Sequence, residues 1–253
     1  MANITAIKIL ADEQTATFGK KLGDPTIPKR TTPPITHFRR PEHITEARVE
    51  AALYSASCKS SVGPDRASTA MLRTLWEHGY KHVLLSLLRQ CYLHLPDFLK
   101  EAWLSPIPKP NRGFRPIAFT SHFGKIVERI MADELAAYLA DLPEMQHQYG
   151  CRSGRHIAAL LSHLQHVAVR SHREIVAIFL DIVGAYHRVG HDPLLDTMEQ
   201  FAVPPHIIEF TADFLNNRSF KVRIYRMVQF ILSDTIARPH TGLPPPPHFR
   251  SAG

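Results

Sequence analysis

A single aspartate follows the most apolar stretch of the chain. Residues 175–180, Ile-Val-Ala-Ile-Phe-Leu, lead directly into Asp181. A short run rich in β-branched and aromatic residues favours a buried strand over a helix, so Asp181 is expected where this strand leaves the core. Because a buried carboxylate is costly unless it is paired or binds a cation, Asp181 is a candidate metal ligand. The alternative interpretation is an aspartate that caps a turn at the end of the strand.

Two basic residues flank a polar, glycine-containing turn. Lys109 and Arg115 lie at the inner ends of two short extended segments within residues 104–118, a pattern that predicts a β-hairpin. Prolines at positions 106, 108 and 110 lack backbone donors and indicate an edge strand. Lysine supplies a point charge and arginine a bidentate donor, so the pair is suited to clamp a triphosphate. The alternative is two solvated loop cations.

A second segment with glycines and arginines runs from Gln148 to Arg155. Its glycines permit close backbone approach, and Arg152 and Arg155 are candidates to meet phosphates. The alternative is a structural loop with exposed arginines.

Helices and a few strands must position these residues. Thr45 is predicted to cap a helix that begins at Glu46, and Ser121 to cap a helix over 123–139 whose apolar stripe faces the core. Gly63-Pro64-Asp65 predicts a turn. Other elements are predicted as helices at about 67–78, 80–95 and 156–170, a helix with Asp192-Pro193 as its N-cap and N1 pair, a helix opened by Pro204-Pro205, and paired strands over 220–225 and 228–232.

These motifs, in this order, resemble the reverse transcriptases of non-LTR retrotransposons. The resemblance extends from about residue 45 to residue 244. The segments that carry it are Lys59 with Gly63-Pro64-Asp65, the hairpin Pro106 to Ala118, the helical segment Gly124 to Ile130, Gln148-Tyr149-Gly150 with Gly154-Arg155, and Asp181-x-x-Gly184-Ala185-Tyr186.

The resemblance implies an α+β fold: the fingers and partial palm of a right-hand polymerase, helix-rich with a small antiparallel sheet and truncated within the palm. Residues 1–44 are expected to form a basic, proline-containing and poorly ordered arm. Residues 45–240 would be the reverse transcriptase part, and residues 241–253 a proline-rich tail that departs from the family.

The resemblance also implies roles for single residues. Asp181 would be catalytic and would bind magnesium together with the carbonyl oxygen of Ile182, in a family that uses two such ions. Lys109 and Arg115 would bind the phosphates of a deoxynucleotide, and Tyr186 would lie under its sugar. The residues implied to line the template or primer are Gln148, Arg152 and Arg155. The implied partners are therefore an RNA template, a DNA primer and deoxynucleotides.

Two departures from the family bear on activity. His187 stands where these elements usually carry a second aspartate, and the expected Tyr/Phe-x-Asp-Asp motif is absent. In-line transfer with two metals needs carboxylates from the motif of Asp181 and from the missing Asp-Asp motif. We therefore expect a polymerase fragment that is inactive as this chain. The alternatives are a non-catalytic nucleic-acid-binding remnant of a decayed element and a misjoined gene model.

Composition is consistent with a nucleic-acid partner. The net charge is +7 and the pI is about 9.5, as expected of a protein that binds a polyanion. The alternative interpretation of this charge is a generally basic soluble protein. Three separated cysteines form no zinc spacing and indicate a reducing compartment, so a location in the nucleus or cytoplasm is expected. No apolar run approaches the roughly 20 residues of a membrane helix, and no secretory signal is apparent.

Overall fold

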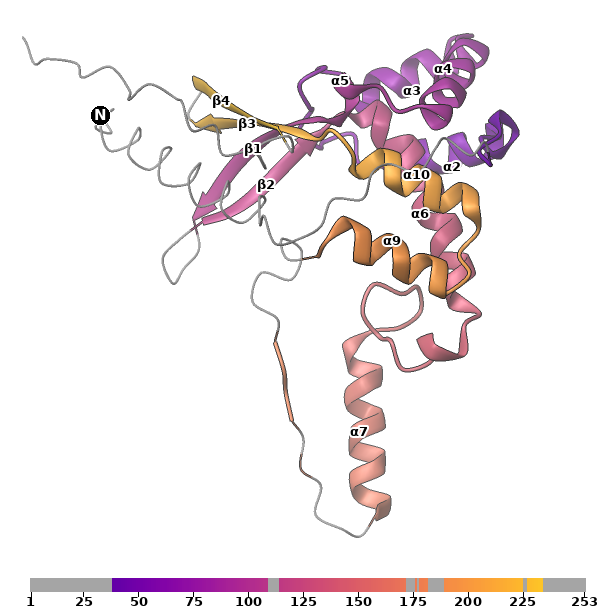
Figure 1. Ribbon diagram of the computed structural model, residues 1–253, viewed down its shortest axis with the longest axis vertical. Coiled ribbons are helices and arrows are strands. Elements are labelled where there is room, and N and C mark those ends of the chain that lie inside the picture. The colour runs from indigo at the N-terminus through magenta and orange to yellow at the C-terminus, as the bar shows by residue number, and fades with distance from the viewer. Residues whose placement is uncertain are drawn as a thin grey trace, which may run out of the picture.

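The computed structural model describes residues 38–108, 114–171, 176, 178–181, 189–224 and 227–233. Within these ranges the chain is helix-rich with one small sheet, an α+β arrangement (Figure 1). The helices are η1 (Pro41–His43), α2 (Glu46–Ser55), α3 (Thr69–Glu77), α4 (Lys81–Leu93), α5 (Asp97–Lys100), α6 (His122–Ala140), η2 (Pro143–Met145), α7 (Ile157–Ser171), α9 (His191–Gln200) and α10 (Pro205–Leu215). The strands are β1 (Glu101–Pro108), β2 (Phe114–Thr120), β3 (Ser219–Ile224) and β4 (Met227–Ser233).

Two helix starts follow the capping chemistry predicted from the sequence, and a third does not. Thr45 accepts a hydrogen bond from the backbone N–H of Arg48, and Ser121 accepts from two N–H groups in the first turn of α6, so both predicted caps are confirmed. The predicted N-cap at Asp192 is wrong, because α9 begins at His191 with Gly190 in the cap position. Asp192 lies in the first turn, where its negative charge still complements the helix dipole.

The sheet is mixed, which corrects the expectation of an antiparallel sheet. Its strand order is β2-β1-β3-β4; the pairs β1–β2 and β3–β4 are antiparallel hairpins, and β1 runs parallel to β3. Parallel neighbours require a long connection. The connection from β1 to β3 spans residues 109–218 and contains β2 and the helices α6 to α10. The sequence predicted the first hairpin from two extended segments around a polar, glycine-containing turn and the second from local alternation. Neither pattern carries information about which strands of different hairpins become neighbours.

The prolines of β1 lie where the strand has one neighbour. Pairing with β3 covers only Glu101 to Leu104, whereas pairing with β2 continues to Pro108. Pro106 and Pro108 are therefore in the part of β1 that forms a sheet edge, as their missing donors predicted.

Helix α6 joins two apolar clusters. Its first half contributes Ile126, Val127, Ile130 and Met131 to the main core, which α2, α3, α4 and α10 complete. Its second half packs through Leu135 and Tyr138 against a smaller cluster on α9 and α10. The apolar stripe predicted for this helix is thus confirmed for the residues that enter the main core.

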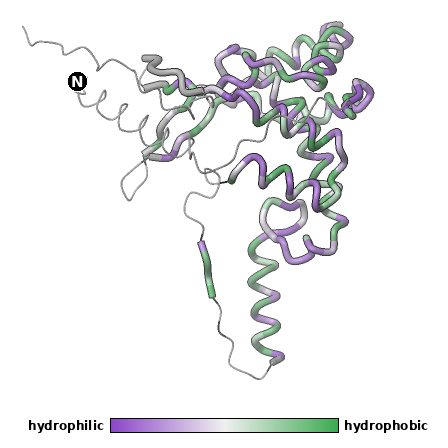
Figure 2. The backbone as a smooth tube through the Cα atoms, in the orientation of Figure 1, coloured by the Kyte–Doolittle hydropathy of each residue, from purple (hydrophilic) through white to green (hydrophobic). Residues whose placement is uncertain are grey.

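The prediction of a buried strand before Asp181 is wrong for the described part of that segment. Residues 178–181 have no regular secondary structure, and the side chains of Ile178, Phe179 and Leu180 are 81%, 84% and 91% exposed. Figure 2 shows this apolar segment running apart from the helices and the sheet. A strand needs a hydrogen-bonded neighbour, and none of the described strands pairs with it. Residues 1–37 and the tail 241–253 lie outside the described residues.

Candidate nucleotide-binding hairpin and its supports

The β1–β2 hairpin presents Arg115 near its tip. Arg115 lies opposite Ile107 in the antiparallel register, and its side chain is exposed. Within the described residues it has no ion-pair partner. An exposed, unpaired guanidinium on a strand is available to an anionic ligand. Lys109, the other predicted clamp residue, lies outside the described residues.

A buried ion pair anchors the start of the hairpin. Lys100, the residue before β1, is 1% exposed, and its Nζ donates to Asp213 Oδ1 on α10 over 2.8 Å. The Oδ2 atom of Asp213 accepts from Arg39 Nη1 at 2.9 Å and from the backbone N–H of Leu95 at 3.0 Å. Burial alone would raise the pKa of Asp213, but these hydrogen bonds outweigh it and hold that pKa below its usual value.

The end of the hairpin is held by a different set of contacts. Ser121 follows β2 directly, is 1% exposed, and donates its hydroxyl hydrogen to Asp65 Oδ2. The next residue, His122, hydrogen-bonds to Thr69 and to the carbonyl oxygen of Ser61. The loop that contains Gly63-Pro64-Asp65 is therefore attached to the junction of β2 and α6.

The two predicted phosphate-binding arginines after α6 contact the protein itself. Arg152 donates to the carbonyl oxygens of Met145 and Ala140, and Arg155 donates to that of Gln146. Because Ala140 is the last residue of α6, Arg152 satisfies a free carbonyl at the helix end. The guanidinium of Arg155 also lies 5.5 Å from the ring centroid of Tyr149. In this structure both arginines shape the loop, and Gln148 is exposed beside them.

Asp181 is exposed and has no described partner. A carboxylate is the oxygen ligand that magnesium prefers, but one carboxylate is too few to hold the ion in octahedral geometry. The described residues contain no group of three His, Cys, Asp or Glu side chains close enough to bind a metal. These residues alone therefore do not fit a two-magnesium centre. Ile182 and Tyr186, which belong to the same motif, lie outside the described residues.

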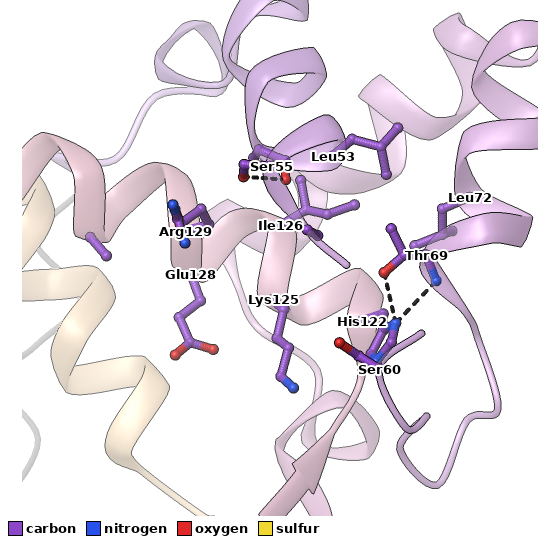
Figure 3. A pocket seen from close by; sticks show the side chains of 13 residues that line it. Leu53, Ser55, Ser60, Thr69, Leu72, His122, Lys125, Ile126, Glu128 and Arg129 are labelled. Carbon is purple, nitrogen blue, oxygen red and sulfur yellow. Dashed lines mark hydrogen bonds between the residues drawn. The ribbon is translucent and has the colours of Figure 1, made fainter. Parts of the chain in front are cut away.

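A pocket of about 340 Å³ lies between α2, α3 and α6 (Figure 3). Leu53, Leu72 and Ile126 give it apolar walls, and His122 contributes the ring that Figure 3 joins to Thr69 by dashed lines. None of the described residues predicted as site residues lines this pocket. It borders the attachment of the Gly63-Pro64-Asp65 loop and is distinct from the exposed face of β2.

Asp213 and Ser121 support the hairpin in ways that the sequence interpretation missed. Asp213 lies three residues after the buried Phe210 on α10, so an acidic residue interrupts the apolar face of that helix. That interruption was the available signal, because a carboxylate on a buried face needs a cationic partner. Ser121 was predicted as a cap, but nothing in its neighbourhood indicated the contact with Asp65, 56 residues earlier.

Comparison with known proteins agrees with these motifs. Residues 107–230 match the family model of reverse transcriptase (RNA-dependent DNA polymerase). The chain is similar to a probable RNA-directed DNA polymerase from transposon BS of Drosophila melanogaster, 28% identical over 73% of this chain and 21% of the relative. It is also similar to a retrovirus-related Pol polyprotein from type-1 retrotransposable element R2 of Bradysia coprophila, 27% identical over 67% of this chain and 20% of the relative. The chain thus spans about one fifth of the length of these relatives.

Among the helices that the structure describes, none has both the length and the apolarity that crossing a membrane requires. The matched segment begins in β1 and ends in β4, so it includes the exposed Arg115 and the Asp181 motif. On this match, residues 107–230 form a reverse transcriptase (RNA-dependent DNA polymerase) domain.

Proposed function

We propose that this chain is part of the RNA-directed DNA polymerase of a non-LTR retrotransposon and contributes the nucleotide-binding fingers and some of the metal ligands to templated nucleotidyl transfer. The observation that carries the proposal is the family match over residues 107–230, which includes strand β2 with Arg115 and the Asp181 motif together. Arg115 presents an exposed guanidinium on a hairpin whose start and end are both attached to the helices, which further supports a role in holding an anionic substrate.

The roles within this proposal follow the chemistry of each side chain. Lys109 and Arg115 bind the triphosphate of the incoming deoxynucleotide, and Tyr186 contacts its sugar. Asp181 and the carbonyl oxygen of Ile182 supply two oxygen ligands to magnesium in the longer polymerase. The partners are an RNA template and a DNA primer. The residues proposed to lie along these strands are Gln148, Arg152 and Arg155.

The chain by itself is proposed to lack polymerase activity. Two-metal nucleotidyl transfer needs several carboxylates, and the 253 residues contain no pair of adjacent aspartates that could complement Asp181. The second candidate function is therefore binding of nucleic acid without catalysis. The net charge of +7 favours it, because phosphate contacts by cationic side chains are sufficient for binding that does not depend on sequence.

Two assays on the purified chain test the proposal. In primer extension on an RNA template with deoxynucleotides and magnesium, we expect no product beyond that of the Asp181→Ala variant. In filter binding of the same primed template, we expect an affinity that falls steeply between about 50 mM and about 200 mM salt. Extension that Asp181→Ala abolishes would refute the proposed inactivity. Failure to bind the primed template even at the lower salt would refute both candidate functions.

A further inference from the structure

The loop between α2 and α3 is fixed to the end of strand β2 through Ser121. The Ser121 hydroxyl donates to Asp65 Oδ2, and its oxygen accepts from the backbone N–H groups of Phe123 and Gly124. One buried side chain thus starts helix α6 and at the same time attaches the loop to it. Because both lone pairs and the hydrogen of this hydroxyl are engaged, its position is closely defined.

His122 holds the two ends of the same loop. Its Nδ1 accepts from the backbone N–H of Thr69 at 3.0 Å, so the proton of a neutral ring is on Nε2. Nε2 lies 3.0 Å from the carbonyl oxygen of Ser61 and donates to it. The ring, which is 4% exposed, therefore connects residue 61 before the turn with residue 69 after it.

Between these side-chain contacts the two backbones touch. A Cβ atom at Gly63 would lie 2.5 Å from the carbonyl carbon of Thr120 and 2.7 Å from the backbone nitrogen of Ser121. Only glycine permits this approach without displacement of one backbone. We refer to Gly63, Asp65, Ser121 and His122 together as the loop–strand junction.

The loop–strand junction lies at one end of β2, and Arg115, the candidate phosphate-binding residue, lies near the other end. Thr120 is the last residue of β2, and Arg115 lies five residues before it on the same strand. With a rise of about 3.4 Å per residue, Arg115 is about 17 Å along the strand, so a tilt of about 10° at Thr120 would move its Cα by about 3 Å. Displacements of about 1 Å already matter for the binding of a reacting group.

We infer that Asp65 is a positioning residue for nucleotide binding: through Ser121 it sets the direction of β2 and therefore the place at which Arg115 meets a triphosphate. This inference rests on the proposed function of Arg115. The Gly63-Pro64-Asp65 turn would then orient β2 in addition to reversing the direction of the chain. The competing explanation is that Asp65 adds only to the stability of the fold.

A double-mutant cycle on the full chain separates the two explanations. The dissociation constant of deoxythymidine triphosphate is measured in magnesium-containing buffer for the wild type, Asp65→Ala, Arg115→Ala and the double variant. We expect Asp65→Ala to weaken binding about tenfold in the wild-type background and to have no further effect when Arg115 is already absent. Independent effects that multiply in the double variant would overturn the inference, and so would an unchanged constant in Asp65→Ala.

Two further variants distinguish a change in the position of Arg115 from a loss of folding. Asp65→Asn retains an oxygen that accepts from Ser121, so it should bind the triphosphate within about twofold of the wild type. Asp65→Glu keeps the charge but moves the carboxylate by one methylene. It should weaken binding several-fold through Arg115, even if Asp65→Ala does not fold. Equal binding by Asp65→Glu and the wild type would contradict a positioning role.

The cycle also distinguishes failure of the inference from failure of the proposed function. If Arg115→Ala binds the triphosphate as tightly as the wild type, the proposed role of Arg115 is wrong, and the inference fails with it. If Arg115→Ala loses binding and Asp65→Ala does not, the inference alone is wrong. Hydrogen exchange supplies an independent measurement. Asp65→Ala should speed exchange in β2 and leave α9 unchanged, and unchanged exchange in β2 would overturn the inference.

Discussion

Lys100 and Asp213 form a buried ion pair that joins the first residue before β1 to helix α10. Their Nζ and Oδ1 atoms are 2.8 Å apart, and the two side chains are 2% and 11% exposed. Arg39, from the segment before α2, adds a second cation at 2.9 Å. A lysine this deeply buried is tolerated because its charge is paired and hydrogen-bonded. The pair fixes where the hairpin leaves the helical part of the protein.

Removal of Asp213 should destabilise the fold strongly. In Asp213→Ala, Lys100 and Arg39 would remain as buried cations without their common acceptor, which costs roughly 3–5 kcal/mol of the free energy of unfolding. Urea denaturation followed by circular dichroism measures this loss. The matched control is Asp133→Ala, which breaks the exposed pair with Arg129 on α6 and should change the free energy by less than about 0.5 kcal/mol. Similar losses in the two variants would contradict a special role for Asp213.

Acid should destabilise the protein through two carboxylates. Burial acts to raise the pKa of both Asp213 and Glu134. Hydrogen bonds from Lys100 and Arg39 outweigh it and lower the pKa of Asp213 overall. Interactions with His206 and Arg48 do the same for the pKa of Glu134. A lowered pKa in the folded state stabilises the fold above the usual pKa, and this contribution is lost as the pH falls through the folded-state value. The free energy of unfolding should therefore decrease below about pH 4.5, the usual value for glutamate.

The carboxylate variants show whether these two residues cause the acid sensitivity. Asp213→Asn and Glu134→Gln should each be less stable than the wild type at neutral pH and should show a shallower loss of stability in acid. A wild-type profile that is flat from pH 6 to below pH 3, about one unit beneath the usual pKa of aspartate, would contradict the prediction.

His43 should add a second pH dependence nearer to neutrality. Burial is the main cause that lowers the pKa of His43 from its usual value of 6.5, and the positive charge of His206 lowers it further. The unfolded chain then binds a proton more readily than the fold, so stability should fall as the pH drops below 6.5 and level off below the folded-state pKa. The other charged groups that act on His43 are Glu134, Arg48 and Glu42.

Substitution of His43 by asparagine tests this second dependence. The amide can still hydrogen-bond to the Tyr92 hydroxyl, which lies 2.8 Å from His43 Nδ1, but it does not titrate. The free energy of unfolding of His43→Asn, measured by urea denaturation from pH 8 to pH 5.5, should vary less with pH than that of the wild type. Identical slopes in the two proteins would show that His43 is not the source.

Gly63 should be far less tolerant of a side chain than another glycine of the chain. An added Cβ at Gly63 would lie 2.5 Å from the Thr120 backbone, so Gly63→Ala must displace the loop or the strand at a cost of about 1–3 kcal/mol. At Gly150 the nearest atom to an added Cβ is the Gln148 amide nitrogen at 3.6 Å, an ordinary contact. Gly150→Ala should therefore be close to neutral. Thermal unfolding of both variants gives the comparison, and equal midpoints would argue against close contact at Gly63.

The parts of the fold that the sequence predicted are those determined by neighbouring residues. The caps at Thr45 and Ser121 and both hairpins follow from side-chain chemistry and alternation within a few positions. The parallel pairing of β1 with β3 was not predictable in this way, since about a hundred residues separate the two strands and no local pattern selects the neighbour.

The candidate site was only partly predictable for a related reason. Residues 178–180 have the composition of a buried strand, but composition cannot supply the neighbouring strand that burial requires, and in the structure these side chains are exposed. Asp213 and Asp65 act through partners 113 and 56 residues away, respectively. Motif spacing identified Arg115 as a candidate; its supports became visible only once distant elements were placed together.

Arginine footprinting tests most directly whether the hairpin is a nucleotide-binding element. The full chain is treated with phenylglyoxal, with and without deoxythymidine triphosphate and magnesium, and the modification of each arginine is measured by peptide mass spectrometry. The proposed function predicts that the triphosphate protects Arg115, while Arg129, exposed and paired with Asp133 on α6, is modified to the same extent in both samples. Equal modification of Arg115 with and without the triphosphate would contradict the proposal.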